Sequence, residues 1–374
     1  MRFPEFSGEW KCTTIGNIGD IKNGPFGSVL HAEDYVENGI PIVTTEHFKT
    51  GLMPSDKFGI PQVSNEDYIR LKGYRLETND IVFSRVGSVD INAHVGIEQN
   101  GWLFSGRVLR VRPKYDIDSL FLHYALSTEA VKRDIRNRAV GQTMPSINTP
   151  ILSSTTIQLP KDLFEQKKVA HFLRLLDERI ITQNKIIEKL QSLIKGLRVC
   201  CMQRVYGNNV YLSEIAQIYQ PQTISSTELT EDGFLVYGAN GIIGKYKDYN
   251  HETEQICITC RGNTCGMVNY TKPMSWITGN AMVINTDKYQ DKVYKKYLYH
   301  YLSAYNFNSI ISGSGQPQIV RTPLEKLKIT LPTISEQKQK AIIFDKIQDK
   351  IDINHKVLNL YIGQKQYLLR QMFI

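Results

Sequence analysis

One string of residues occurs in both halves of the sequence, and no other feature restricts the fold as much. Ile157-Gln-Leu-Pro160 is followed by Glu165-Gln-Lys, and Ile329-Thr-Leu-Pro332 is followed by Glu336-Gln-Lys. Further matches keep the same order in both halves: Ile15 with Ile215, Gly39 with Gly233, Trp102 with Trp276, and Pro145 with Pro317. Because colinear matches at a smoothly falling spacing seldom arise by chance, the sequence predicts an internal repeat with a shorter second copy.

A heptad pattern follows each copy of the repeated string. Apolar residues recur from Val169 to Cys201 in alternating steps of four and three, and a looser version runs from Phe344 to Met372. Such steps place apolar side chains on one face of a helix, so each segment is predicted to be a long helix that packs against another helix. Helices of roughly 40 residues are about 60 Å long. The pair is therefore predicted to act as a rod.

One polar residue interrupts each heptad pattern near its middle, Gln183 in the first and Asn354 in the second. In an antiparallel pair of helices the midpoints meet, so the two amides are predicted to face each other. They would then fix the helix register, as one buried Asn does in a leucine zipper. The alternative is that one or both amides reach solvent at a loosely packed point.

Local signals predict where the long helices begin and where the first one ends. Asp162-x-x-Glu165 and Thr333-x-x-Glu336 match the capping box, in which two side chains accept hydrogen bonds from free main-chain N–H groups. Gly207-Asn208-Asn209 is predicted to close the first helix, since Gly and Asn favour the left-handed conformation found at helix ends.

The segments in front of the long helices are predicted to be mixed sheet and loop with short helices. The candidate strands are Ile81–Phe83, Val108–Val111, Ile256–Ile258 and Met282–Ile284, and the candidate short helices are 120–140 and 295–311. Arg110 and Arg112 alternate with Leu109 and Val111, so one face of that strand is predicted to be basic. A polyanion could lie there, although a solvated strand face is the commoner outcome.

Together these elements predict an α+β protein. Two mixed α/β domains are joined by two long antiparallel coiled-coil helices, and a pseudo-twofold internal repeat relates the halves. The predicted division is 1–160 for the first domain, 161–207 for the first long helix, 208–332 for the second domain and 333–374 for the second long helix.

Charge and composition limit the function classes. The net charge of +8 favours a polyanionic partner such as nucleic acid without demonstrating one. No apolar run approaches the roughly 18 to 20 residues of a membrane span, and nothing at the start of the chain resembles a signal peptide. The six cysteines lack the spacing of a disulfide framework, which suits a reducing compartment. A cytoplasmic location is therefore expected.

The sequence carries no convincing enzyme signature. Gly238–Lys245 has the wrong spacing for a phosphate-binding loop, and Tyr246 follows it in place of the Ser or Thr that binds magnesium. Cys257-x-x-Cys260 has no second Cys or His pair at metal-ligand spacing, so no metal site is predicted. Neither an amino-methyltransferase motif nor a nuclease carboxylate cluster is found. The residues therefore favour a binding protein.

The order of the elements resembles the specificity subunit of type I restriction-modification systems. In that family a variable domain and a helix opening with Leu-Pro and Glu-Gln alternate twice, and here this order covers essentially the whole chain, from Trp10 and Ile15-Gly16-Asn17-Ile18 onward. Two departures are visible. The first copy has one extra residue between its Leu-Pro and Glu165, and the second heptad pattern contains Lys365.

The resemblance implies a subunit without catalytic activity, whose two target recognition domains each read one half of an asymmetric bipartite DNA site. The helices would set the spacing of the domains and dock the partners. These partners would be two modification subunits, which methylate adenine from S-adenosylmethionine, and restriction subunits, which use ATP and Mg. No cofactor is expected on this chain itself. The alternative function is a coiled-coil scaffold whose two variable domains bind proteins rather than DNA.

Loop side chains that reach base edges are the predicted DNA contacts, because Arg, Lys, Asn and Gln read bases while other contacts position the protein. Arg85 and Arg261 are favoured since both follow equivalent predicted strands. The candidates in the first domain are Lys22, Arg85, Asn92, His94, Arg107, Gln142 and Thr143. The candidates in the second domain are Gln222, Asn240, Lys245, Arg261, Asn263, Asn280, Gln316 and Gln318.

Overall fold

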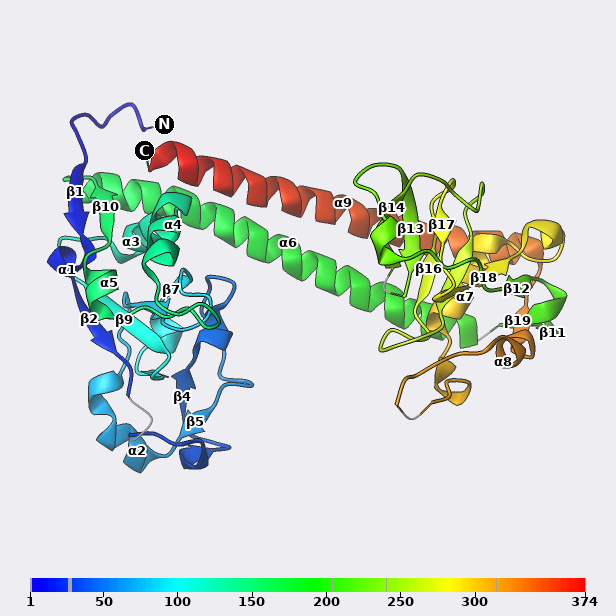
Figure 1. The fold of residues 1–374 in the computed structure, drawn as a ribbon, viewed down its shortest axis with the longest axis horizontal. Helices are drawn as coiled ribbons and strands as arrows, with labels where there is room; N and C mark the ends of the chain where they lie inside the picture. The colour runs from blue at the N-terminus through cyan, green and yellow to red at the C-terminus, as the bar shows by residue number, and fades with distance from the viewer. Residues whose placement is uncertain (1, 26–28, 204, 240, 314, 374) are drawn as a thin grey trace. The chain divides into compact units, whose positions relative to one another are not determined.

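A computed structural model of the chain describes residues 2–25, 29–203, 205–239, 241–313 and 315–373 (Figure 1). The chain forms two compact units, one made of Met1–Thr182 with Leu358–Ile374 and the other of Gln183–Val357. Each unit therefore contains one segment of each long helix. In the described ranges, no helix is long and apolar enough to cross a membrane.

The first unit is built on a four-stranded antiparallel sheet of order β2-β9-β6-β7. Its strands are β2 (Gly19–Asn23), β9 (Val108–Pro113), β6 (Ile81–Ser84) and β7 (Asn92–His94). A second sheet has the order β3 (Tyr35–Val36), β5 (Gln62–Val63), β4 (Ile40–Val43) and β8 (Leu103–Phe104), with β4 parallel to β8. β1 (Lys11–Thr14) pairs with β10 (Thr156–Leu159). The short helices are α1 (Ile15–Ile18), α2 (Asn65–Arg70), α3 (Ser119–Leu126), α4 (Glu129–Arg138) and α5 (Thr149–Ser153).

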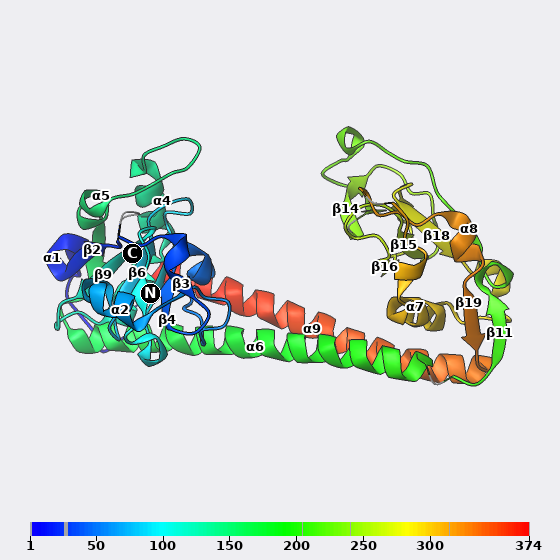
Figure 2. The ribbon, with the colours of Figure 1, turned by 90° about the horizontal axis from the view of Figure 1, so that it is seen from below.

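The second unit repeats this arrangement with fewer elements. Its four-stranded antiparallel sheet has the order β12 (Gln217–Tyr219), β18 (Ala281–Asn285), β15 (Ile256–Thr259) and β16 (Val268–Tyr270). A smaller sheet contains β14 (Gly241–Tyr246), β13 (Phe234–Gly238) and β17 (Trp276–Ile277), with β13 parallel to β17. β11 (Asn208–Tyr211) and β19 (Lys328–Leu331) lie side by side (Figure 2). The short helices are α7 (Lys295–Ala304) and α8 (Arg321–Glu325).

The fold class predicted from the sequence is confirmed, and each of the four predicted strands lies within an observed one. The helix predicted over 120–140 is wrong in one respect, because it is two helices, α3 and α4. The break follows from local hydrogen bonds: Ser127 Oγ donates to the main-chain oxygen of His123 at 2.8 Å, and Thr128 Oγ1 donates to that of Ala125 at 2.8 Å. Such side chains compete with the helical hydrogen bonds. The helix predicted over 295–311 likewise ends early, at Ala304.

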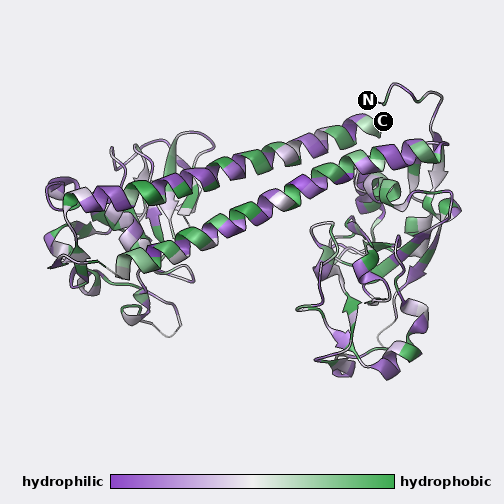
Figure 3. Cartoon of the chain, turned by 180° about the vertical axis from the view of Figure 1, so that it is seen from behind, coloured by the Kyte–Doolittle hydropathy of each residue, from purple (hydrophilic) through white to green (hydrophobic). Residues whose placement is uncertain are grey.

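Two long helices, α6 (Leu163–Gln203) and α9 (Ile334–Met372), carry the heptad patterns, and hydrophobic and hydrophilic residues alternate along both (Figure 3). In the first unit, Leu173 and Leu176 of α6 share one buried cluster with Leu368 and Met372 of α9 and with the sheet residue Phe83. The start of α6 therefore packs on the end of α9, as an antiparallel pair requires. The heptad residues thus join the helix pair to the domain core in this unit.

The helix ends differ from the predictions at two points. Thr333 and Glu336 form the predicted capping box: the main-chain N–H of Glu336 donates to Thr333 Oγ1 at 3.3 Å, and that of Thr333 donates to the Glu336 carboxylate at 3.1 Å. Glu165 does not cap α6. It is buried, and its carboxylate accepts from Arg2 at 2.6 and 2.7 Å and from Trp10 Nε1 at 3.1 Å. The first predicted capping box is therefore confirmed only in part. Asp162 Oδ1 accepts the main-chain N–H of Phe164 at 2.8 Å and caps α6, but Glu165 does not complete the box because these distant partners hold its carboxylate.

Gly207 and the two asparagines after it do not close the first helix either. α6 ends at Gln203, while Asn208 and Asn209 already belong to β11. A Cβ atom on Gly207 would lie 2.0 Å from the main-chain oxygen of Leu331. The glycine is therefore needed for the close approach of β11 to β19 rather than for a helix cap.

The two polar heptad residues touch in the second unit. Gln183 Nε2 donates to Asn354 Oδ1 at 2.5 Å and to the Asn354 main-chain oxygen at 3.1 Å. Asn354 Nδ2 in turn donates to the main-chain oxygen of Lys350 at 2.6 Å. Both side chains are buried, so this pair satisfies polar groups that would otherwise be costly to bury. Its role in fixing the register stays a prediction.

A buried glutamine anchors each long helix to a domain helix of the same unit. Gln166 Nε2 donates to the main-chain oxygen of Pro160 at 3.0 Å, and its Oε1 accepts from the N–H of Asp118, the residue that caps α3, at 2.9 Å. Gln337 repeats this contact with Pro332 at 2.9 Å and with the N–H of Tyr294, which precedes α7, at 2.8 Å. These duplicated contacts, here termed the glutamine joints, account for the Gln of the repeated Glu-Gln string.

Candidate DNA interface

In the first unit, several predicted DNA contacts gather where three strands of the four-stranded sheet end. Arg85 follows β6 and Arg107 precedes β9, and the N–H of Arg85 donates to the main-chain oxygen of Arg107 at 3.0 Å. The N–H of Gly24, which follows β2, donates to the oxygen of Val108 at 3.0 Å. A Cβ atom on Gly24 would lie 1.9 Å from the oxygen of Ser105, so glycine is required for this close approach. We term this end of the sheet the first sheet end.

A loop carrying two further candidates is attached to the first sheet end. Val140 and Ser146 exchange main-chain hydrogen bonds at 2.9 and 2.8 Å, which closes the loop that contains the exposed side chains of Gln142 and Thr143. The N–H of Ile147 donates to the oxygen of Arg85 at 2.9 Å. The structure thus brings Arg85, Arg107 and the loop together.

The second unit builds the same arrangement from different residues. The N–H of Cys260 donates to the oxygen of Asn280 at 3.0 Å, and the N–H of Ile319 donates to the oxygen of Cys260 at 3.0 Å. Ser312 and Gln318 close the corresponding loop with two main-chain hydrogen bonds of 2.8 Å. Asn280, Arg261, Asn263, Gln316 and Gln318 therefore lie on or beside this second sheet end.

The main-chain pairing shows that the two arginines follow equivalent strands but do not occupy equivalent positions. Cys260, not Arg261, makes the hydrogen bonds that Arg85 makes, so Arg261 corresponds to Val86. Arg85 Nη1 donates to the main-chain oxygen of Gly106 at 3.1 Å. Gly279 is the counterpart of Gly106 in the second unit, and its main-chain oxygen accepts instead from Gln220 Nε2 at 2.9 Å. Gln220 was not predicted from the sequence, although Gly106 and Gly279 also match in the internal repeat.

Two candidates in the first unit are held by other side chains: Asn92 is buried and His94 is half-buried. Asn92 is 2% exposed, and its amide is held by the His123 ring at 2.7 Å and by Ser127 at 3.2 Å. The His94 ring contacts Ser119 Oγ at 2.9 Å, and burial lowers the pKa of this histidine. Both side chains fasten β7 to α3.

The remaining candidates are spread over other elements. Lys22 Nζ lies 5.1 Å from the ring centre of Tyr74, and Lys245 Nζ lies 3.4 Å from a carboxylate oxygen of Asp232. Gln222 is exposed, and its main-chain oxygen accepts from Trp276 Nε1 at 3.3 Å. Asn240 lies outside the described residues.

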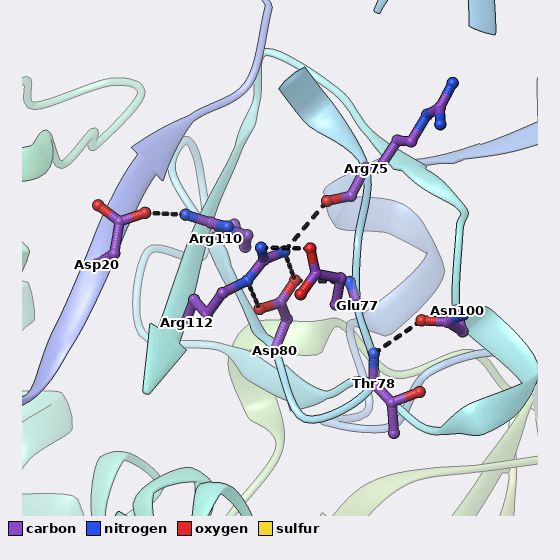
Figure 4. Close-up of polar contacts among 8 residues, drawn as sticks. All are labelled: Asp20, Arg75, Glu77, Thr78, Asp80, Asn100, Arg110 and Arg112. Carbon is purple, nitrogen blue, oxygen red and sulfur yellow. Dashed lines mark hydrogen bonds and ion pairs between the residues drawn. The ribbon is translucent and has the colours of Figure 1, made fainter. Parts of the chain in front are cut away.

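The predicted basic face of β9 is wrong, because acidic side chains cover it (Figure 4). Arg112 Nε and Nη2 donate to the carboxylate of Asp80 at 2.7 and 2.8 Å, and Nη1 donates to Glu77 at 2.5 Å. These hydrogen bonds, above all that of Asp80, raise the pKa of Arg112. Arg110 is buried and pairs with Asp20 on the neighbouring strand β2. No polyanion is needed to neutralise either arginine.

Metal ligation finds no support in the described part of the chain, where no three His, Cys, Asp or Glu side chains are grouped so that they could hold an ion. Cys257 is fully buried in β15, and burial raises the pKa of its thiol to about 12. Cys257 and Cys260 thus form part of the domain interior.

Known proteins match this chain along most of its length. The family described as type I restriction modification DNA specificity domain matches residues 7–192 and 208–360. The specificity subunit of the type I restriction enzyme EcoprrI from Escherichia coli is 31% identical over 147 residues, which are 38% of this chain and 36% of that protein. The specificity subunit of the type I restriction enzyme MjaVIII from Methanocaldococcus jannaschii is 25% identical over 410 aligned positions, covering 95% of this chain and 89% of that protein. The crystal structure of a type I restriction-modification S subunit from M. genitalium has the same fold, with a TM-score of 0.64, 18% identity and coverage of 100% of this chain and 99% of the other.

Proposed function

Since this chain belongs to the type I restriction modification DNA specificity family, as the non-catalytic specificity subunit of such a system, we propose that its two domains each read one half of an asymmetric bipartite DNA site. The observation that carries the proposal is the duplicated sheet end. Both copies have the same main-chain hydrogen bonds but present different side chains, such as Gln142 and Thr143 in the loop of the first and Gln316 and Gln318 in the loop of the second. Two recognition domains that share a main-chain arrangement but carry different side chains are suited to two half-sites of different sequence.

We propose DNA contacts for candidates whose side chains are at least partly exposed. In the first domain these are Lys22, Arg85, Arg107, Gln142 and Thr143, and in the second they are Gln222, Lys245, Arg261, Asn263, Asn280, Gln316 and Gln318. Asn240, which lies outside the described residues, is proposed from its place in the sequence alone. Asn92 and His94 are left out because the Asn92 amide and His94 Nε2 already bond to side chains of the same domain.

The division into recognition domains at 1–160 and 208–332, with spacer helices at 161–207 and 333–374, is part of the same proposal. Readers on one face of B-DNA must be about one helical turn apart, roughly 34 Å, and a helix pair sets such a distance better than a flexible linker. The glutamine joints support this role, because they tie each long helix to a short helix of its domain through buried hydrogen bonds.

Partner subunits complete the proposed assembly. Two modification subunits would dock on the helix pair and restriction subunits would join them, with S-adenosylmethionine, ATP and Mg bound by these partners. In support, α6 and α9 expose large apolar side chains outside the heptad seam, including Leu193 and Leu360, the latter 72% exposed. Where exposed apolar side chains form a contiguous patch, they mark an interaction surface. A mass measurement of the assembled complex that finds one modification subunit would contradict the stoichiometry.

Methylome sequencing tests the function directly. A host that expresses an active modification subunit is compared with and without this chain. We expect a bipartite, asymmetric methyladenine motif that is lost when the chain is deleted. An unchanged methylome would instead favour a scaffold whose domains bind proteins.

A further inference from the structure

A cavity of about 460 Å³ opens beside Arg107 at the first sheet end. Hydroxyl groups are its commonest polar lining, and one guanidinium accompanies them. Its polar lining residues are Tyr35, Thr44, Thr45, Glu46, Ser105 and Arg107. The duplicated fold alone does not account for this concentration of donors.

Ser105 supplies the most informative group in the cavity lining. The residue is 8% exposed, and its Oγ is buried without a hydrogen-bond partner among the described residues. A buried hydroxyl without a partner costs free energy, so such groups are usually satisfied. An occupant of the cavity that accepts a hydrogen bond would remove this cost.

Arg107 has a rigid main chain and an unengaged side chain. Its carbonyl accepts from the N–H of Arg85 at 3.0 Å. On either side of Arg107, the N–H of Ser105 donates to the main-chain oxygen of Val43 at 2.9 Å, and the N–H of Val108 donates to that of Ser105 at 3.0 Å. Its side chain is exposed, and none of the hydrogen bonds or ion pairs found among the described residues involves its guanidinium. Arg107 also acts on the nearby hydroxyl of Tyr35, whose pKa is raised by burial and by Asp34 while Arg107 opposes the rise.

The lining groups suit an occupant that only accepts hydrogen bonds. Serine, threonine and tyrosine hydroxyls and a guanidinium can all donate, and a phosphate offers acceptor oxygens with negative charge. Glu46 is the exception, but its carboxylate pairs with Lys49 three residues later. The net charge of the cavity lining therefore comes from Arg107.

We propose that this cavity binds a phosphate of the DNA backbone, with Arg107 pairing with the charge and Ser105 donating a hydrogen bond. The inference rests on the proposed DNA-reading function and assigns one of its predicted contacts to positioning rather than to base reading. The backbone is the convex part of the duplex and fits a concave site, whereas bases are read by side chains that enter a groove. The first domain would thus be held in register on its half-site by Arg107.

Salt-dependent binding separates a phosphate contact from a base contact. The full-length chain, assembled with its modification subunits, is titrated with a duplex carrying its methylation motif and with a random duplex of equal length. We expect Arg107→Ala to weaken binding to both duplexes by a similar factor, about tenfold at low salt, and to reduce the slope of log affinity against log salt by about 1. Arg107→Lys should keep the slope, and Ser105→Ala should weaken binding with little change of slope.

Arg133 provides the matched control, because it is an exposed arginine on α4 of the same unit and does not line the cavity. Arg133→Ala removes the same charge and should leave the slope close to that of the unaltered complex. An equal loss in both variants would mean that only overall charge matters, and the cavity proposal would be overturned.

The methylation motif distinguishes the remaining outcomes. A phosphate contact predicts that the Arg107→Ala and Glu46→Gln complexes methylate the same motif as the unaltered complex. A relaxed base in one half of the motif would show that Arg107 or Glu46 reads a base and would overturn the proposal while leaving the recognition function intact. Failure of the unaltered complex to prefer any bipartite duplex would count against the recognition function itself.

Discussion

Arg107, Arg110 and Arg112 are close neighbours in the sequence, but their side chains have different surroundings. Arg110 and Arg112 are held by carboxylates from β2 and from the segment before β6, whereas Arg107 faces a cavity. The sequence predicted one basic strand face from the alternation of residues. The distribution of free positive charge depends on Asp20 and Asp80, which only the folded chain brings close.

Asp80→Asn should destabilise the first domain. Asp80 is 1% exposed. Its carboxylate accepts two hydrogen bonds from Arg112 and one from the main-chain N–H of Glu77, the last at 2.7 Å. Loss of its charge leaves a largely covered guanidinium without its main partner, at a cost of about 2 to 4 kcal/mol. Thermal unfolding should show a lower midpoint. Glu77→Gln, which removes an exposed carboxylate from the same arginine, is the control and should cost less than about 1 kcal/mol.

The stability of the first domain should depend on pH through His123. Burial, aided by Lys365, His94 and Lys132, lowers the pKa of His123 to about 3. As the pH falls through about 6.5, His123 takes up a proton in the unfolded chain but stays neutral in the folded chain. The free energy of unfolding is therefore highest above that pH and decreases as the pH falls. We expect a loss of about 2 kcal/mol between pH 6.5 and 5, measured by urea unfolding.

Substitution isolates this effect from other titrations. His123→Gln should reduce the pH dependence in that interval, although its stability at pH 8 is lower. His171→Gln, which alters an exposed histidine on α6, should keep the full dependence. Equal pH dependence in the unaltered chain and in His123→Gln would contradict the assignment.

Among the secondary-structure elements, the long helices combine a regular seam with one polar contact. Gln183→Leu should leave Asn354 Oδ1 buried without its partner and cost about 1 to 3 kcal/mol. The double change of Gln183 and Asn354 to leucine should recover stability but loosen the register, because an apolar seam tolerates shifts. Urea unfolding gives the first quantity, and pulsed electron paramagnetic resonance distances between the helices give the second. Unaltered stability together with unaltered alignment in the double variant would exclude a register role.

The glutamine joints provide a second test on the elements. Gln337→Leu removes the acceptor of the Tyr294 N–H and the donor to Pro332, and should destabilise the second domain by about 2 to 3 kcal/mol. If the joint also orients the domain, the variant complex should accept motifs whose half-sites are spaced one base pair differently. Gln339→Leu alters an exposed glutamine on the same helix and serves as the control for both readouts. A destabilised variant that keeps strict spacing would limit the joint to a stabilising role.

For the whole molecule, the two sheet ends should be separable in function. Gln142→Ala and Gln318→Ala change exposed side chains of the two corresponding loops. We expect each change to relax a different half of the methylation motif, with a loss of discrimination of about 1 to 3 kcal/mol per base contact. Methylome sequencing of hosts carrying each variant measures this. Relaxation of the same half by both variants would contradict one domain per half-site.

Much of the architecture could be predicted because its signals are local periods. Heptad steps of four and three predicted α6 and α9, and short apolar runs between turn residues predicted β6, β9, β15 and β18. The candidate interface was less predictable. The sequence predicted Arg85 and Arg107 as contacts, and this stays a prediction. The correspondence of Arg85 with Cys260 required main-chain hydrogen bonds that no spacing in the sequence reveals.

The sequence by itself determined the duplicated order of domains and helices, the polar interruption of both heptad patterns and the family to which they point, since each is written in residues close along the chain. Only the tertiary structure decided that Glu165 holds Arg2 and Trp10 instead of capping α6, that Arg110 and Arg112 are neutralised, and that Arg107 faces a cavity with Ser105. The physical reason is that the state of a charge or a hydroxyl depends on which partners folding brings within a few ångströms. Those partners come from segments far apart in the sequence.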